Sequence, residues 1–177
     1  MKKLMIIALL LTSMSVQVQQ KEVAEIRKLY AKAKADVALV SKSGQSEVGE
    51  TEVTSWYTEP GVGPTKETLH YYFRTKEDEH LGVMYHSPFL ITRKHNVGAT
   101  EYYEEYLYND CDQLAFYFEK TSQSEIRLYW DNCNGNDFFH KAVKGDSDID
   151  ENKVFFIQRY AADLHVAFSQ MLNHNYD

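Results

Sequence analysis

Acidic side chains recur at positions where neighbouring strands would bring them together. Glu104, Glu119 and Asp131 lie on three consecutive aromatic-rich segments that are typical of strands. Two carboxyl groups about 5–5.5 Å apart are the arrangement that a retaining glycosidase uses. Arg74 and Arg127 can pair with these carboxylates instead. A small glycosidase-like hydrolase is therefore one hypothesis, but no Gly-x-Ser-x-Gly elbow or glycine-rich phosphate loop accompanies the carboxylates.

Tyrosine stands out in the composition, with 13 residues against 9 phenylalanines and 2 tryptophans. Successive side chains of a strand point to opposite faces, so an inward Phe116 and an inward Leu128 place Tyr117 and Tyr129 outward. The same reasoning gives one outer face lined by Tyr72, Arg74, Tyr106, Tyr117, Arg127 and Tyr129. Tyrosine and arginine are enriched at interface hot spots, which predicts a ligand-binding face. The preference of exposed strands for tyrosine is the alternative explanation.

Two cysteines, Cys111 and Cys133, each follow a strand-like segment that ends in an Asn/Asp turn. In an antiparallel meander these alternate turns lie at the same end of the sheet. They are roughly 10 Å apart, whereas a disulfide needs about 5.5 Å between Cα atoms, so the loops must bend. An even cysteine count favours the Cys111–Cys133 bridge if the chain is exported, with two separate thiols as the alternative. The chain has no Cys-x-x-Cys motif of a redox enzyme.

The seven histidines show no spacing typical of a metal motif. A zinc site would have to be assembled from distant strands, for example from His70, His86 and His140. The acidic run from Asp146 to Asp150 resembles the start of a calcium loop but lacks the glycine and the later glutamate. Asp148 and Glu151 have capping-box spacing, which predicts the start of a helix. We therefore expect neither a metal nor an organic cofactor.

Two amphipathic helices frame the strands. In residues 19–40, Val23, Ile26 and Val37 recur at helical spacing between charged residues. After Glu151, one apolar face is formed by Ile157, Tyr160, Ala161, Leu164, Phe168 and Met171.

Between the helices, aromatic and β-branched segments alternate with turn residues, which predicts strands. The expected strands are 52–58, 68–74, 81–86, 89–94, 101–108, 113–120, 125–131 and 138–143. Short turns join the last four, as in an antiparallel meander. The sequence thus predicts an α+β fold, a meander of about seven strands flanked by an N-terminal and a C-terminal helix. We expect both helices on one face of the sheet.

Residues 1–18 have the pattern of a secretory signal peptide. Lys2 and Lys3 precede an apolar run from Leu4 to Leu11, and small residues follow it. The run is too short for a spanning helix, which argues against an uncleaved anchor. Residues 19–177 are then a single α+β domain, expected in the periplasm or outside the cell.

The formal net charge is −7, and an acidic surface repels nucleic-acid phosphates and anionic membranes. No second apolar run is long enough for a membrane span. We therefore expect no nucleic-acid partner and no membrane span.

The layout resembles uncharacterised families of small secreted bacterial proteins. The resemblance is carried by the leader, the helix Ile26–Lys34, the strand His70–Phe73 and two hairpins in which Tyr106–Cys111 is similar to Leu128–Cys133. It spans most of the mature chain. These families have no established activity, so the resemblance implies no catalytic residue. Their first hairpin often has glycine where this chain has Cys111, which implies a disulfide variant.

These observations favour a non-catalytic protein that binds a protein, a peptide or a glycan on its tyrosine face. The alternatives are the small hydrolase and an envelope structural protein without a small ligand. A deep pocket with buried carboxylates whose pKa values are perturbed would favour the hydrolase, and a flat aromatic face would favour the binding protein.

Removal of the leader is the first testable prediction. The mature protein should begin between about Val16 and Lys21, because small residues close the signal-peptide pattern there. Mass spectrometry of protein recovered from an exporting host measures this directly. An intact Met1 on the exported form would contradict the prediction.

Overall fold

The computed structural model describes residues 2–40, 48–61, 63–78, 82–133, 138–145 and 149–172, with side chains from Gln19 onward. These residues form two helices and one sheet of seven strands. Helix α1 spans Lys2–Val40 and helix α2 spans Glu151–Leu172. The strands are β1 (Val48–Glu59), β2 (Gly63–Asp78), β3 (Val83–Val97), β4 (Thr100–Tyr108), β5 (Leu114–Lys120), β6 (Ser124–Asp131) and β7 (Phe138–Gly145).

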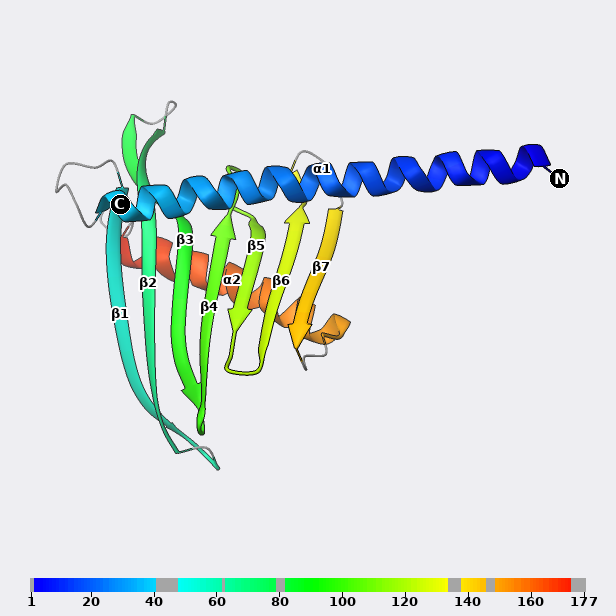
Figure 1. Cartoon of the computed structure of the whole chain (residues 1–177). Helices are drawn as coiled ribbons and strands as arrows, with labels where there is room; N and C mark the ends of the chain where they lie inside the picture. Colours follow the sequence, from blue (N-terminus) through cyan, green and yellow to red (C-terminus); the bar gives the residue numbers. More distant parts are fainter. Residues whose placement is uncertain are drawn as a thin grey trace.

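Each strand pairs antiparallel with the strands that precede and follow it, so the sheet order is β1 to β7 (Figure 1). The predicted α+β class, with a seven-stranded meander between an N-terminal and a C-terminal helix, is confirmed. Alternation of aromatic and β-branched residues with short turns explains this topology, because hairpin connections join neighbouring antiparallel strands.

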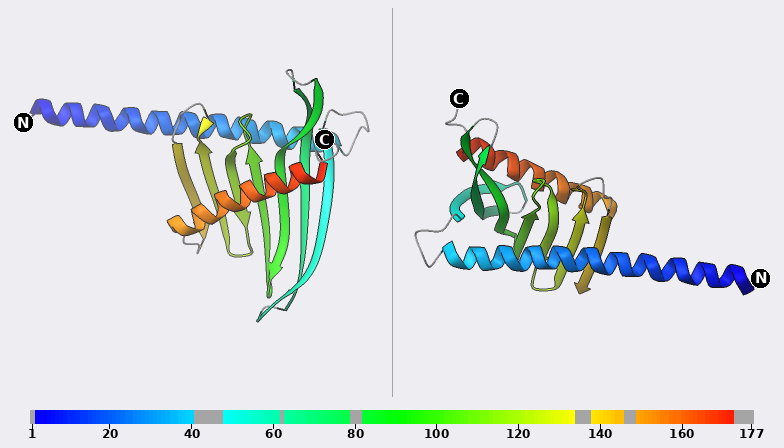
Figure 2. Two further views of the ribbon diagram at one scale, coloured as in Figure 1. Left: turned by 180° about the vertical axis from the view of Figure 1, so that it is seen from behind. Right: turned by 90° about the horizontal axis from the view of Figure 1, so that it is seen from above.

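The two helices lie on opposite faces of the sheet, which forms the middle of three layers (Figure 2). Helix α1 packs Val23, Ile26 and Ala33 against one face, and α2 packs Ile157, Ala161, Leu164 and Phe168 against the other. The expectation that both helices share one face is therefore wrong. The physical reason is that the central strands carry apolar side chains at both odd and even positions, so each strand has two faces to bury.

Helix α1 continues beyond β7 toward its N-terminus and leaves the sheet behind (Figure 1). Among the side chains that the structure describes, the first buried one of α1 is Val23, which follows the predicted leader. The described side chains of α1 that pack on the sheet include Val23, Ile26 and Ala33, all in the expected mature chain. Neither of the helices, as far as their residues are described, is apolar enough over a sufficient length to cross a membrane.

Strand β3 unites two predicted strands, 81–86 and 89–94, although Pro88 stands between them. The register between β2 and β3 shifts between Tyr72 and Phe73, and Phe73 is the partner of Pro88. A bulge allows a proline, which has no N–H to donate, to lie inside a central strand. The predicted break at this proline is therefore a register shift within one continuous strand.

Helix α2 begins after Asp150, whose Oδ1 accepts the N–H of Lys153 at 2.8 Å. This is the N-cap arrangement, in which a short acidic side chain satisfies a free N–H of the first turn. The predicted capping residue Asp148 lies outside the described residues. Capping by Asp150 fixes the first helical turn and with it the position of Lys153.

Cys111 and Cys133 form the predicted disulfide, with 6.1 Å between their Cα atoms. The β4–β5 turn bends to make this possible. Asn109 Oδ1 accepts the N–H groups of Cys111 and Gln113, both at 3.0 Å, and Asp112 adopts a φ of 56°. Asparagine and aspartate tolerate such turns because their side chains bond to the nearby backbone.

Substitution of one phenylalanine on each face tests the three-layer arrangement. Phe116 is buried under α1, and Phe168 of α2 is buried on the other face. Phe116→Ala and Phe168→Ala should each lower the free energy of unfolding by about 3–5 kcal/mol, through lost burial and a cavity. Urea unfolding measures the loss. Phe155, which is 60% exposed, is the control, and Phe155→Ala should change stability by no more than about 0.5 kcal/mol. A small loss for Phe116→Ala alone would contradict the covering of this face by α1.

Candidate functional site

An open cleft of about 450 Å³ lies between the N-terminal half of α2 and strands β3–β5. We call it the α2 cleft. The sheet contributes Arg93, Glu104, Tyr106, Tyr117 and Glu119, and the helix side contributes Asp150, Asn152, Lys153, Phe156, Ile157 and Tyr160. Its size and its mixture of aromatic and polar side chains are those of a small-molecule or side-chain binding site.

Strand register places the polar residues of the cleft in one row across the sheet. Arg93 of β3 is opposite Glu104 of β4, and Glu104 is opposite Glu119 of β5. Tyr106 and Tyr117 form the next row on the same face, also directly opposite each other. Directly opposed side chains on one face are close enough to interact. Strand pairing alone therefore brings these polar groups together.

Glu104 is buried on this face, with 6% of its surface exposed, and three side chains lie within hydrogen-bond distance of its carboxylate. Arg93 Nη1 donates at 3.1 Å and the Tyr106 hydroxyl at 3.0 Å, both to Oε2. The Tyr117 hydroxyl lies 3.0 Å from Oε1. A buried carboxylate needs such partners because it has lost its water.

Glu119 is equally buried and lies on the other side of Tyr117. Its Oε2 is 2.8 Å from the Tyr117 hydroxyl, and its Oε1 is 3.0 Å from Lys153 Nζ. The hydroxyl of Tyr117 therefore stands between two carboxylates. The structure thus confirms the sequence-based expectation that Glu104 and Glu119 face each other across neighbouring strands.

Glu67 of β2 extends this network. Arg93 Nε donates to Glu67 Oε1 at 2.5 Å, and the hydroxyls of Tyr160 and Tyr57 donate to Glu67 at 3.2 and 3.3 Å. Burial raises the pKa of Glu67, but the hydrogen bond and charge of Arg93 outweigh it and lower the pKa from 4.5. The Arg93 guanidinium lies 4.8 Å from the ring centre of Tyr160, so α2 covers the ion pair with an aromatic ring.

The tyrosines of the cleft act as hydrogen-bond donors. Burial, reinforced by the charge of Glu104, raises the pKa of Tyr106 and of Tyr117 well above the usual 10.0. Burial also raises the pKa of Tyr160, with the Glu67 charge adding to it. These phenols keep their protons at physiological pH, so each can donate one hydrogen to a carboxylate.

The six residues of the predicted binding face do not share a face. Tyr106 and Tyr117 point toward α2, whereas Tyr72 and Tyr129 pack with the residues under α1. Tyr106, Tyr117 and Tyr129 each expose 2% or less of their surface. The prediction of one solvent-facing tyrosine surface is therefore wrong, because Tyr117 pairs with Leu128 and Phe116 pairs with Tyr129 across the β5–β6 ladder.

The two predicted arginines are engaged on the α1 side. Arg74 forms an ion pair with Asp36 of α1, and its guanidinium lies 4.1 Å from the ring centre of Phe89. Arg127 pairs with Glu125 at 3.1 Å and lies over the ring of Phe118. Burial, with the negative charge of Glu50 and other nearby carboxylates, raises the pKa of Tyr72 to about 12. On this side the predicted residues attach α1 to the sheet and stabilise the surface of neighbouring strands.

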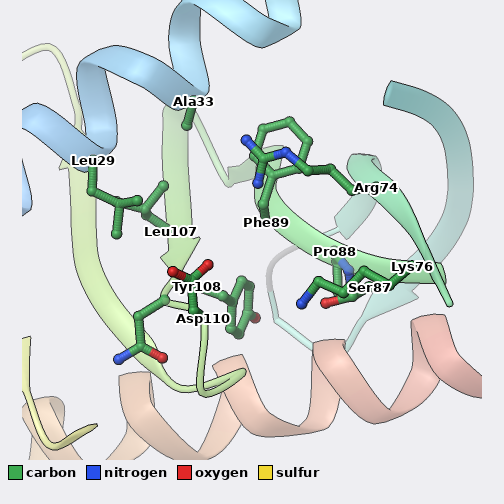
Figure 3. A pocket seen from close by; sticks show the side chains of 11 residues that line it. Leu29, Ala33, Arg74, Lys76, Ser87, Pro88, Phe89, Leu107, Tyr108 and Asp110 are labelled. Atoms are coloured by element: carbon green, nitrogen blue, oxygen red, sulfur yellow. The ribbon is translucent and has the colours of Figure 1, made fainter. Parts of the chain in front are cut away.

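A second cavity lies under α1 beside Arg74 and Phe89 (Figure 3). Its volume is about 20 Å³, enough for a water molecule. Figure 3 shows Leu29 and Ala33 of α1 above it, Leu107 and Tyr108 from the sheet, and the Arg74 guanidinium beside the Phe89 ring. This cavity is too small for an organic ligand, so the α2 cleft is the stronger candidate site.

The remaining chemistry-bearing residues are separated. Asp131 lies away from the carboxylate pair, where its Oδ1 accepts the N–H of Cys133 at 3.3 Å. His70 bonds to Glu50, and His86 bonds to Thr75. Among the described residues, no three His, Cys, Asp or Glu side chains are grouped so that they could hold a metal ion.

The residues of the site network that sequence reasoning missed include Glu67, Arg93, Lys153 and Tyr160. Arg93 could have been found, because strand alternation places it on the same face as the apolar Ile91. Lys153 and Tyr160 come from α2, and their partners depend on which face α2 covers. That information is not local to either segment.

Comparison with protein-family models, with curated proteins and with solved structures found no match for this chain.

The pH dependence of stability should report the Glu67–Arg93 pair. Because the folded-state pKa of Glu67 is lowered, its stabilisation is present above pH 4.5 and is lost as the pH falls through the folded-state pKa. Glu67→Gln removes this contribution, so its melting temperature should fall less between neutral pH and about pH 3 than that of the native protein. Thermal unfolding across this range measures both profiles. Parallel profiles would contradict the assignment.

Proposed function

We propose that this protein is a non-catalytic binding protein and that its ligand site is the α2 cleft. The observation that carries the proposal is the pair of buried carboxylates, Glu104 and Glu119, at the base of an open cleft. Phe156 and Tyr160 of α2 form an aromatic wall beside them. A ligand with a polar head and an apolar body suits this combination, since few polar groups fix orientation while apolar walls supply contact area.

The exposed ring of Phe156 supports this proposal. It is 64% exposed although it lines the cleft. Covering such a ring with a ligand removes apolar surface from water, which favours binding. The partner classes expected from the sequence, a protein, a peptide or a glycan, all carry groups of the size that the cleft accepts.

A small glycosidase-like hydrolase is the second candidate, favoured by the opposed positions of Glu104 and Glu119. Glycoside hydrolysis needs one carboxyl group as an acid and the other as a nucleophile or base, both free to reach the substrate. In the α2 cleft Arg93 binds Glu104 and Lys153 binds Glu119. These ion pairs occupy the carboxylates, which favours binding over hydrolysis.

We also propose that the protein functions in the periplasm or outside the cell. The Cys111–Cys133 disulfide supports this location, because such bonds persist in oxidising compartments. The leader pattern of residues 1–18 agrees with it.

Two neighbouring phenylalanines allow a matched test of the binding site. Phe155 and Phe156 are exposed to a similar extent, 60% and 64%, but only Phe156 lines the cleft. A set of fragments with cationic, anionic, neutral polar and sugar heads is screened by ligand-observed NMR. We expect at least one fragment to bind the native protein and Phe155→Ser alike and to bind Phe156→Ser more weakly, because lost apolar contact lowers affinity.

Two outcomes would contradict the binding proposal. One is that no fragment binds, which would favour a structural role in the envelope. The other is that Phe155→Ser and Phe156→Ser weaken binding equally. Release of nitrophenol from aryl glycosides by the native protein, lost in Glu104→Gln, would establish the hydrolase instead.

A further inference from the structure

The α2 cleft contains more hydrogen-bond acceptors than hydrogens. Glu104 Oε1 and Glu119 Oε2 both lie within hydrogen-bond distance of the Tyr117 hydroxyl, at 3.0 and 2.8 Å. A phenol has a single hydrogen and can donate to only one of them at a time. One carboxylate oxygen therefore faces the lone pairs of the hydroxyl. A further donor at this point would satisfy both carboxylates.

Acidic residues also outnumber basic residues around the cleft. The acidic residues that line the cleft are Glu104, Glu119 and the helix-capping Asp150, and the basic residues are Arg93 and Lys153. Arg93 is also shared with Glu67, a further carboxylate of the network. The cleft thus has an excess of negative charge, partly shielded from water, where electrostatic attraction to a cation is strengthened.

The ammonium group of Lys153 shows where a cation can bind in the cleft. Its ammonium group is 3.0 Å from the buried Glu119 Oε1, while its own side chain is 36% exposed. It is in the first turn of α2, and its four-carbon stem is flexible enough to turn toward solvent. An ammonium group from a ligand could take this place, leaving the helix backbone where it is.

We infer that the head group recognised by the α2 cleft is an organic cation, a primary ammonium or a guanidinium group, that displaces Lys153 from Glu119. This inference rests on the proposed binding function and names its ligand class. The cation donates to Glu119 and to the oxygen that Tyr117 leaves without a hydrogen. The body of the ligand lies along Phe156 and Tyr160, whose ring faces also attract cations. A lysine or arginine side chain of a peptide has this chemistry, as does a free aliphatic or aromatic amine.

Three probes that differ only in the head group test the inference: benzylamine, benzyl alcohol and benzoate. Binding to the full mature protein is measured by NMR titration at neutral pH. We expect benzylamine to bind about tenfold or more tightly than benzyl alcohol, because its hydrogen bonds are charge-assisted. We expect benzoate to bind more weakly still. A second arm compares free lysine amide with a lysine in the middle of a short peptide, which separates a free amine from a peptide side chain as the source.

Two substitutions have opposite expected effects. Glu119→Gln should weaken benzylamine binding about tenfold or more, because it removes the charged acceptor. Lys153→Met keeps the apolar stem and removes the competing ammonium, so it should strengthen binding roughly two- to fivefold. Lys94→Met is the matched control. Lys94 pairs with Glu101 at 3.2 Å on the exposed surface, so its loss changes the net charge equally but should leave benzylamine affinity nearly unchanged.

The outcomes separate this inference from the function on which it rests. If benzyl alcohol or benzoate binds best, and Phe156→Ser weakens that binding, the cleft is a binding site but the cation assignment is wrong. If Lys153→Met weakens benzylamine binding or leaves it as in Lys94→Met, displacement of Lys153 is wrong. If no fragment of any charge binds, the proposed function fails together with the inference. Should Glu119→Gln unfold the protein, the Lys153→Met comparison still decides.

Discussion

Both faces of the central strands are covered by helices, and this constraint determines the chemistry of the whole molecule. A sheet with one face in water can place polar side chains on that face at no cost. Here α1 and α2 cover opposite faces, so polar residues at either alternating position of β3–β6 are drawn into the interior. A buried charge is tolerated only when it is paired and hydrogen-bonded. The ion pairs and tyrosine hydrogen bonds of the structure follow from this requirement.

The consecutive residues Glu104 and Glu105 show the constraint most directly. They point to opposite faces, and both are buried. Glu105 accepts hydrogen bonds from Tyr30 and Lys34 of α1 and from Tyr103, whereas Glu104 belongs to the network under α2. Helix α1 is thus attached to the sheet through Glu105, and α2 through Glu119, which bonds to Lys153, in addition to apolar packing. Hydrogen-bonded networks of this kind favour one arrangement of the packed layers.

The two networks differ in their access to solvent, and the proposed function depends on that difference. On the α1 side, Glu105 exposes 2% of its surface and bonds to Lys34 and two tyrosines, and the cavity under α1 has a volume of about 20 Å³. On the α2 side the network opens into a cleft of about 450 Å³ beside the exposed ring of Phe156. Buried carboxylates with charged and tyrosine partners therefore attach α1 to one face of the sheet and form a candidate recognition site on the other face.

The sequence by itself determined both helices of the α+β fold, most strands and their antiparallel order, because strand alternation, turn residues and helical spacing are local patterns. It also favoured the Cys111–Cys133 pairing, because the cysteine count is even and export was expected. It also placed Glu104 and Glu119 on neighbouring strands, since hairpin connections bring consecutive strands together. It did not determine which face Tyr117 and Tyr129 occupy, because tyrosine is nearly as apolar as the phenylalanine and leucine beside it. Only the tertiary structure decided that α2 covers one face and α1 the other, and thereby that Lys153 meets Glu119 and Tyr160 meets Glu67. Those partners are far apart in the chain, and packing against a sheet with two apolar faces is a property of the whole molecule rather than of any segment.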